Sequence, residues 1–147
     1  MSQKGAFAMI RAFFAAAAVV ALAAPVFAAP APTGVWSMPN GKAQVRIADC
    51  GGALCATLVA LKKPTDKQGR PKVDKHNPNP ALRSRPVIGV SLVRARPDGA
   101  DWAGDFYNPD DGRTYAGRIM ADGADRLKLR GCVLGLVCKT QVLTRVD

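Results

Sequence analysis

Apolar and polar residues alternate with a period of two over short stretches of this chain. The alternation is clearest at residues 44–47, 102–106 and 126–130. Short alternating segments predict half-buried β-strands, and little of the chain shows the periodicity of a helix. We expect eight strands, at residues 34–38, 43–48, 53–61, 87–95, 101–107, 113–120, 126–131 and 138–146.

The strongest turn signal is the run at residues 107–117, which reads Tyr-Asn-Pro-Asp-Asp-Gly-Arg-Thr-Tyr-Ala-Gly. Pro109 presets its own φ angle, and Gly112 can take a positive φ at no steric cost, so the run predicts a β-hairpin. Eight short strands joined mostly by tight turns predict an all-β fold, an eight-stranded antiparallel up-and-down barrel. Closure of the barrel removes the exposed edges that an open sheet would leave.

One connection, at residues 62–86, is long and basic. It carries eight Lys and Arg side chains against only Asp66 and Asp74, in a protein whose net charge is already +10. Such a loop attracts anionic partners, which include a lipid surface, an acidic polysaccharide or an anionic ligand. The alternative is a solvated loop that keeps the protein soluble.

The N-terminal segment has the pattern of a signal peptide. Lys4 and Arg11 come before an apolar run at residues 12–22, and Val26 and Ala28 fit a cleavage site after Ala28. We therefore expect a signal peptide at residues 1–28, a Pro- and Ala-rich leader at 29–33, and one domain at 34–147. The mature protein would be periplasmic or secreted; an uncleaved anchor is the alternative.

Four cysteines in a small exported domain predict disulfides. Local bridges fit the turn pattern better than the two crossed pairings, since each would close one hairpin: Cys50 with Cys55, and Cys132 with Cys138. Neither spacing is the C-x2-C of zinc sites, so we expect no metal.

Catalytic and nucleic-acid-binding patterns are weak. His76 is the only histidine and lies in a polar run without a motif that would aim it at a nucleophile. We therefore expect no enzyme and no cofactor; a cluster of Asp74, His76 and Asp111 around a pocket would revive that class. No aromatic residues interleave with the basic loop as stacking platforms do, so we expect no nucleic-acid partner.

The barrel interior is the remaining candidate site. An eight-stranded barrel is either filled by side chains or wide enough for one small ligand, and both alternatives stay open here. Ala56, Gly89, Gly104 and Gly117 could leave room. If the barrel is hollow, we expect an apolar lining inside it, which includes two tyrosines if their side chains point inward. We also expect two arginines at the mouth, which would pair with a carboxylate or phosphate. The lining residues are Leu58, Val90, Leu92, Tyr107 and Tyr115, and the arginines are Arg83 and Arg85.

Several motifs together resemble one family. They are Gly34-Val35-Trp36, the Cys50–Cys55 hairpin, residues 77–89, the 107–115 hairpin, and the closing segments 129–135 and 140–146. In this order they are similar to the bacterial exported family called domain of unknown function 2147. Leu143 departs from the Trp that the family usually has in its closing strand.

The resemblance implies a lipocalin-like (calycin-type) barrel in which Trp36 and Arg145 stack to close one end. It implies no substrate, since the family has no agreed function. Our leading hypothesis is a non-enzymatic periplasmic barrel for a small, partly apolar ligand that carries an anionic group, with membrane-surface contact through the basic loop as an addition. The rival is a protein-interaction module like a small protease-inhibitor barrel, which would use the leader or the basic loop.

Overall fold

The computed structural model describes residues 31–146. The expected signal peptide at 1–28 and the first residues of the leader lie outside this range. Within the described residues, no helix is both long and apolar enough to cross a membrane.

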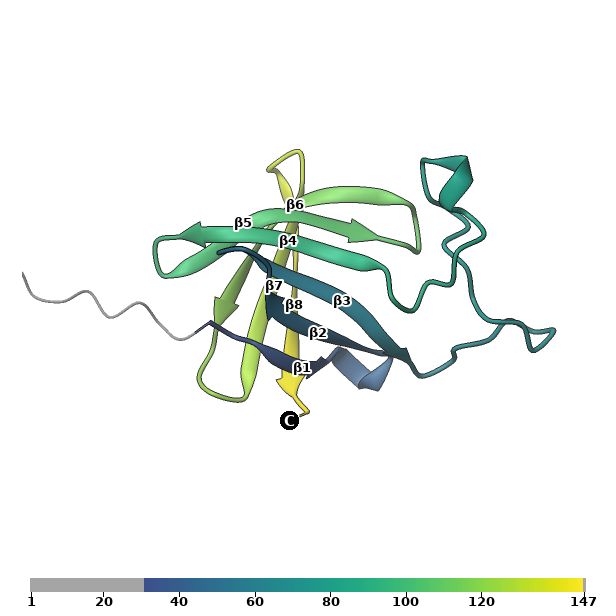
Figure 1. Ribbon diagram of the computed structural model, residues 1–147. Helices are drawn as coiled ribbons and strands as arrows, with labels where there is room; N and C mark the ends of the chain where they lie inside the picture. The colour runs from purple at the N-terminus through teal and green to yellow at the C-terminus, as the bar shows by residue number, and fades with distance from the viewer. Residues whose placement is uncertain (1–30, 147) are drawn as a thin grey trace, which may run out of the picture.

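Eight antiparallel strands form a closed barrel in which each strand pairs with its neighbours in sequence, and the last pairs with the first (Figure 1). The all-β up-and-down barrel predicted from the alternation is confirmed. The strands are β1 (Gly34–Ser37), β2 (Ala43–Asp49), β3 (Leu54–Leu61), β4 (Ser91–Asp98), β5 (Asp101–Asn108), β6 (Arg113–Ala121), β7 (Arg126–Val133) and β8 (Val137–Arg145).

The fourth strand is the one whose predicted start was wrong. It begins at Ser91 rather than at residue 87. The backbone N–H of Val87 donates to Lys72, and that of Val90 donates to the carbonyl of Val87. The Gly89 N–H and the Val90 carbonyl bond to Leu58 of β3. Residues 87–90 therefore complete the long loop with a turn that meets β3, instead of extending β4.

One end of the barrel is filled. Trp36, Leu54, Leu127 and Leu143 are fully buried there. Leu143 pairs with Leu127 across β7 and β8, so this leucine fills the core where the family usually has a tryptophan. This end is a packed core and offers no room for a ligand.

Arg145 and Trp36 cover the closed end. The Arg145 guanidinium lies 4.2 Å from the centroid of the Trp36 ring, which places the two in the contact that the resemblance implied. The same guanidinium donates to the carbonyls of Ala124 and Thr33 at 2.9 and 3.0 Å. Arg145 thus ties β8 both to the β6–β7 turn and to the segment before β1.

Both local disulfides are present. Cys50 is bridged to Cys55 at the β2–β3 turn, and Cys132 is bridged to Cys138 at the base of the β7–β8 turn. Each closes one hairpin, as the spacing predicted.

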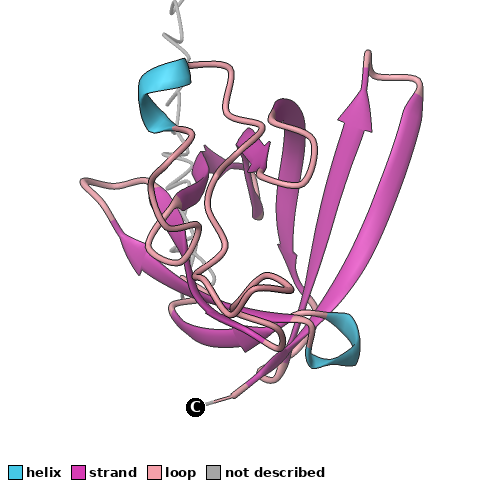
Figure 2. Cartoon of the chain, turned by 90° about the vertical axis from the view of Figure 1, so that its right-hand side faces the viewer, coloured by secondary structure: helices cyan, strands magenta, loops and turns pink. Residues whose placement is uncertain are grey.

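The opposite end of the barrel is open and carries the long loop, residues 62–90. Figure 2 looks at this end, with the pink loop segments lying across it. Two short 3-10 helices, η1 (Pro39–Gly41) and η2 (Pro80–Leu82), also stand at this end. Proline at the start of each fits a helix N-terminus, where its missing N–H would have no partner within the helix.

Candidate functional site

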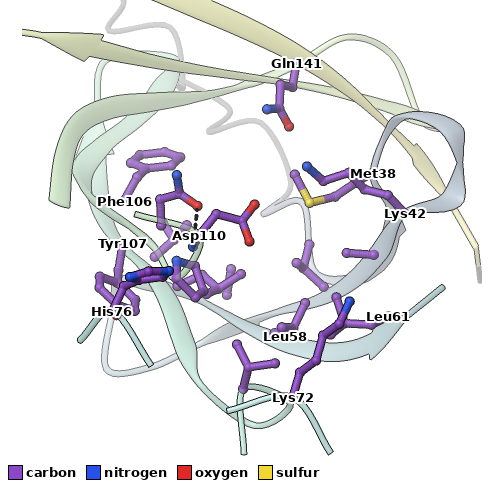
Figure 3. Close-up of a pocket in the computed structure, with 18 of the residues that line it drawn as sticks. Met38, Lys42, Leu58, Leu61, Lys72, His76, Phe106, Tyr107, Asp110 and Gln141 are labelled. Carbon is purple, nitrogen blue, oxygen red and sulfur yellow. Dashed lines mark hydrogen bonds between the residues drawn. The ribbon is translucent and has the colours of Figure 1, made fainter. Parts of the chain in front are cut away.

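A cavity of about 1080 Å³ opens at the loop end of the barrel. This volume is within reach of the clefts that hold small molecules, at their upper end. Its inner wall is apolar and comes from most of the strands, because inward positions alternate along each of them. The main apolar lining residues are Val45, Ile47, Ala56, Leu58, Leu61, Leu92, Val93, Phe106, Ile119 and Leu129 (Figure 3).

The four small residues expected to leave room do not act alike. A side chain at Gly117 would collide with the Phe106 ring, so that ring already occupies the space. Gly104 is covered by the backbone of β4 at Arg94 and Ala95. Ala56 lines the cavity, whereas Gly89 has open space around it and does not line it. The cavity is therefore made by the short side chain of Ala56 and by the barrel's width, not by the glycines.

The cavity mouth is polar and mainly basic. Five basic side chains line it, namely Lys42, Arg70, Lys72, Lys75 and Lys139, against the carboxylates of Asp66 and Asp110. Arg70 is paired with Asp66 at 2.9 Å. Among the described residues, the four lysines form no ion pair, so an excess of positive charge remains at the mouth.

Four of the predicted lining residues do line the cavity: Leu58, Leu92, Tyr107 and Tyr115. Tyr115 lies directly opposite Phe106 in the β5–β6 pairing, so the two share one face of the sheet. Tyr107 pairs with Thr114 and follows Phe106 directly, so it lies on the opposite face of the sheet. Tyr107 reaches the cavity from the side of the loop.

The other three predicted site residues are corrected by the structure. Val90 is buried but lies in the turn before β4, where its carbonyl accepts from Leu58 N–H, and it does not line the cavity. Arg83 and Arg85 do not line it either. Arg83 donates to the backbone carbonyl of Asn77 at 2.8 Å, and Arg85 pairs with Asp74. Both arginines are used within the loop, so neither is placed to receive an anion in the cavity.

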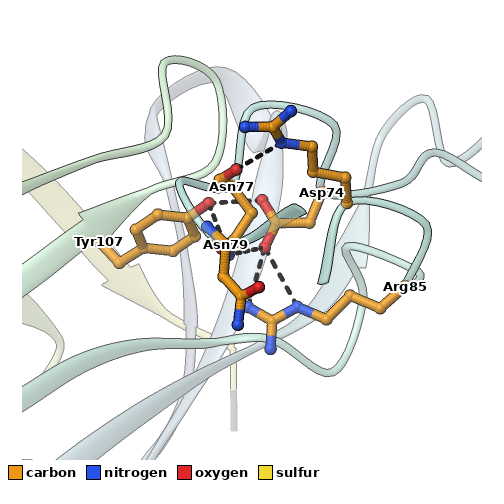
Figure 4. A network of polar contacts seen from close by, with 6 residues as sticks. Asp74, Asn77, Asn79, Arg85 and Tyr107 are labelled. Carbon is orange, nitrogen blue, oxygen red and sulfur yellow. Dashed lines mark hydrogen bonds and ion pairs between the residues drawn. The ribbon is translucent and has the colours of Figure 1, made fainter. Parts of the chain in front are cut away.

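Asp74 is the centre of a polar network that fastens the loop to the barrel (Figure 4). Its carboxylate is fully buried. It accepts from the Tyr107 hydroxyl at 2.6 Å, from the Asn77 amide at 2.8 Å and from Arg85 Nη2 at 2.8 Å. Tyr107 belongs to β5, whereas the other three residues belong to the loop, so this network is a tertiary anchor.

The protonation of the network follows from its contacts. Burial raises the pKa of the Asp74 carboxyl, but hydrogen bonds from Tyr107, Asn77 and Arg85 outweigh burial and hold this pKa below its usual value. The pKa of Tyr107 is raised, first by burial and then by its hydrogen bond to the Asp74 carboxylate. Asp74 is thus an acceptor and Tyr107 a donor at neutral pH.

The loop also touches the tip of the β5–β6 hairpin. A side chain at Gly112 would collide with the backbone carbonyl of His76. His76 itself lines the cavity mouth, as Figure 3 shows beside Tyr107 and Asp110. Asp74 and Asp111 do not line the cavity. Asp74 is engaged in the anchor, and Asp111 accepts from the Tyr115 hydroxyl.

Sequence reasoning missed the lysines as site residues. Lys42 lies after η1 and Lys139 lies on an inward position of β8, far from the basic loop in sequence. A signal for Lys139 was present, because it alternates in phase with Gln141 and Leu143. That signal places it on the barrel interior only once the register of β8 is known.

Comparison with known proteins agrees with the fold. The structure is similar to that of HP1028, a protein from the human pathogen Helicobacter pylori that belongs to the lipocalin family. The two share 25% sequence identity and superpose with a TM-score of 0.67, over 79% of this chain and 83% of HP1028. No curated protein matches the chain significantly.

A family model matches residues 34–145, which is nearly all of the barrel. The matched family is described as "Uncharacterized protein conserved in bacteria (DUF2147)". With the match and the barrel in agreement, this chain belongs to the DUF2147 family.

Proposed function

We propose that this protein binds one small, partly apolar ligand with an anionic group, and that it acts by binding rather than by catalysis. The observation that carries the proposal is the cavity itself, which is apolar inside and basic at its mouth. A pocket of mostly apolar lining with a few convergent polar groups is the usual form of a small-molecule site. The lipocalin-like fold supports the same class of function.

The shape of the ligand follows from the distribution of polarity. An acyl chain or another apolar body would contact Val45, Leu58 and Phe106 inside the barrel. A carboxylate or phosphate would remain at the mouth near the lysines, where both charges keep partial contact with water. This arrangement replaces Arg83 and Arg85 as the anion-binding groups.

Binding is tested with protein purified from its own cells. Native mass spectrometry should show a small co-purified ligand, and an anionic fluorescent fatty acid should bind and be displaced by unlabelled fatty acid. No bound species together with no binding of the probe would refute the proposal. A stoichiometric protein partner in the absence of any ligand would instead support the rival protein-interaction module.

Lysine substitutions sharpen the test of the anionic group. We expect Lys72→Ala with Lys75→Ala to weaken probe binding about tenfold, since two charges near a carboxylate are removed. The matched control is Lys63→Ala with Lys67→Ala, two lysines of the same loop that do not line the cavity. Equal affinities for both double variants would leave the lysines without a role in binding.

We also propose that the protein is exported and acts in the periplasm. The N-terminal pattern and the pairing of all four cysteines in disulfides support this location. N-terminal sequencing of the protein from the periplasmic fraction should give Ala29 as its first residue. Recovery of the full-length chain from the cytoplasm would refute this proposal.

A further inference from the structure

The tip of the β7–β8 hairpin exposes a compact group of large apolar side chains. Leu134 is 90% exposed, Leu136 85%, Val137 72% and Val133 46%. In Figure 1 this tip stands at the top of the molecule, beyond the labelled part of the barrel. Singly exposed apolar residues are ordinary, but four within five positions at a projecting tip point to an interaction site.

The turn conformation makes these side chains harder to explain by folding alone. Leu134 and Gly135 have φ angles of 51° and 69°. Two successive positive φ angles favour Asn-Gly, whereas a Leu in the left-handed region is uncommon. Leu134 is thus costly for the backbone and almost fully exposed to water. Neither burial nor backbone conformation accounts for a leucine at this position.

The tip is held in a fixed, projecting shape. Val133 and Val137 pair across the hairpin, directly above the Cys132–Cys138 disulfide. The Leu136 N–H donates to the Val133 carbonyl at 3.0 Å. A short, cross-linked turn cannot fold back to bury its leucines, and it loses little conformational entropy when it binds.

The tip adjoins the cavity mouth and its positive charge. Val133 and Val137 line the mouth at one side, and Lys139 lies two residues beyond Val137. Lys42, Lys72 and Lys75 belong to the same rim. Of the two carboxylates at the mouth, Asp66 pairs with Arg70, and Asp110 is outnumbered by the four lysines.

We propose that the 133–137 tip and the mouth lysines form one docking surface for an anionic lipid bilayer. The leucines would enter the interface between headgroups and acyl chains, while the lysines contact the phosphates. Apolar insertion combined with attraction between basic side chains and anionic lipids is how peripheral proteins bind membranes. A protein partner fits less well, because exposed leucines flanked by flexible lysines offer few fixed hydrogen bonds.

The docked orientation turns the cavity mouth toward the bilayer. A partly apolar ligand could then pass between the membrane and the barrel without crossing water. This inference goes beyond the proposed ligand binding, and the two are measured separately. Vesicle binding is measured without added ligand, and the displacement assay is performed without vesicles.

The test is sedimentation of the mature protein with vesicles of phosphatidylcholine alone and with vesicles that contain about one third phosphatidylglycerol. We expect binding to the anionic vesicles that weakens with salt, and little binding to the neutral ones. The double variant Leu134→Asn with Leu136→Ser should bind the anionic vesicles at least about tenfold more weakly, because two insertable side chains are lost.

Asn at position 134 suits the turn, so this variant keeps or raises the thermal stability of the protein. Weaker vesicle binding without a loss of thermal stability would show that the two leucines act in membrane binding and not in folding. The matched control is Val142→Thr with Val146→Thr, which removes two partly exposed apolar side chains elsewhere and should bind as the wild type does. The displacement assay in solution should be unchanged, since Leu134 and Leu136 do not line the cavity.

Three results would overturn the inference. They are no binding of the wild type to either vesicle, equal binding to neutral and anionic vesicles, and full binding by the Leu134→Asn/Leu136→Ser variant. A failed displacement assay with intact vesicle binding would refute only the ligand proposal.

Discussion

The two hairpins at the open end of the barrel are held in opposite ways. The β5–β6 hairpin is tied to the rest of the protein by side-chain contacts, through Tyr107 to Asp74 and through Gly112 against His76. The tip of the β7–β8 hairpin, residues 133–137, makes no side-chain hydrogen bond or ion pair with other described residues, and its base is closed by the Cys132–Cys138 disulfide.

The way in which each hairpin is held suits its position in the molecule. A hairpin fixed by polar tertiary contacts orders its neighbour, and here β5–β6 positions the long loop over the cavity. A hairpin fixed by a covalent cross-link needs no neighbour, so its tip is free to present apolar side chains to something outside the chain. The first is part of the site's frame, whereas the second is available for binding.

The largest expected effect comes from removing the anchor at its centre. Asp74→Ala leaves Arg85 and Tyr107 without their acceptor in a buried place, and should lower the free energy of unfolding by about 3 kcal/mol. Urea denaturation measures this change. Asp111→Ala is the control at the exposed tip of the same hairpin, where about 1 kcal/mol or less is expected. Equal losses for both variants would show that the buried Asp74 network stabilises the protein no more than the exposed Asp111 contact does.

The two turn glycines give a matched pair across the hairpins. Gly112 and Gly135 have φ angles of 71° and 69°, so Ala strains the backbone equally at both, by about 1 kcal/mol. At Gly112 the new methyl group also meets the His76 carbonyl, whereas nothing lies within 4 Å at Gly135. We expect Gly112→Ala to cost about 2 kcal/mol more than Gly135→Ala in thermal or urea unfolding. Similar costs would contradict a close contact between loop and hairpin.

The two tyrosines of the β5–β6 hairpin test how far the anchor depends on a single hydroxyl. Tyr107→Phe removes a donor to the buried Asp74 carboxylate and should cost about 1–2 kcal/mol. Tyr115→Phe removes a donor to the exposed Asp111, where water can take its place, and should cost about 0.5 kcal/mol or less. Chemical denaturation of both variants checks the order, and a larger loss for Tyr115→Phe would reverse our view of the two contacts.

Of these changes, acid should lower the free energy of unfolding least, because a protonated Asp74 keeps part of its hydrogen bonding. The pKa of Asp74 is depressed in the folded protein, so its contribution to stability is complete above the usual carboxyl pKa of 3.8 and is lost as the pH falls through the lowered value. No change from this group is expected between pH 7 and about 5. The Asp74→Asn variant should lose less stability than the wild type between pH 5 and 2.5, measured by urea midpoints.

The barrel was predictable because its signals are local. Alternation along each strand and Gly-rich turns between strands specify where the chain reverses, as at Gly112 and Gly123. Loop closure over five or six residues likewise favours the Cys50–Cys55 and Cys132–Cys138 bridges over crossed ones. The start of β4 was missed because residues 87–90 are as apolar as a strand, although Val87 bonds within the loop and Gly89 and Val90 turn to bond with Leu58 of β3.

The sequence by itself determined the eight-stranded barrel, the two local disulfides and the excess of positive charge, but it left open whether the barrel is filled or hollow. Tertiary structure alone decided which charges face the cavity. Arg83 and Arg85 were attractive candidates by residue type, but the folded loop engages them in contacts with Asn77 and Asp74. Lys42 and Lys139 meet at one mouth only because closure of β1 on β8 brings distant strands together. Such pairings depend on register around the whole barrel, and no local pattern encodes them.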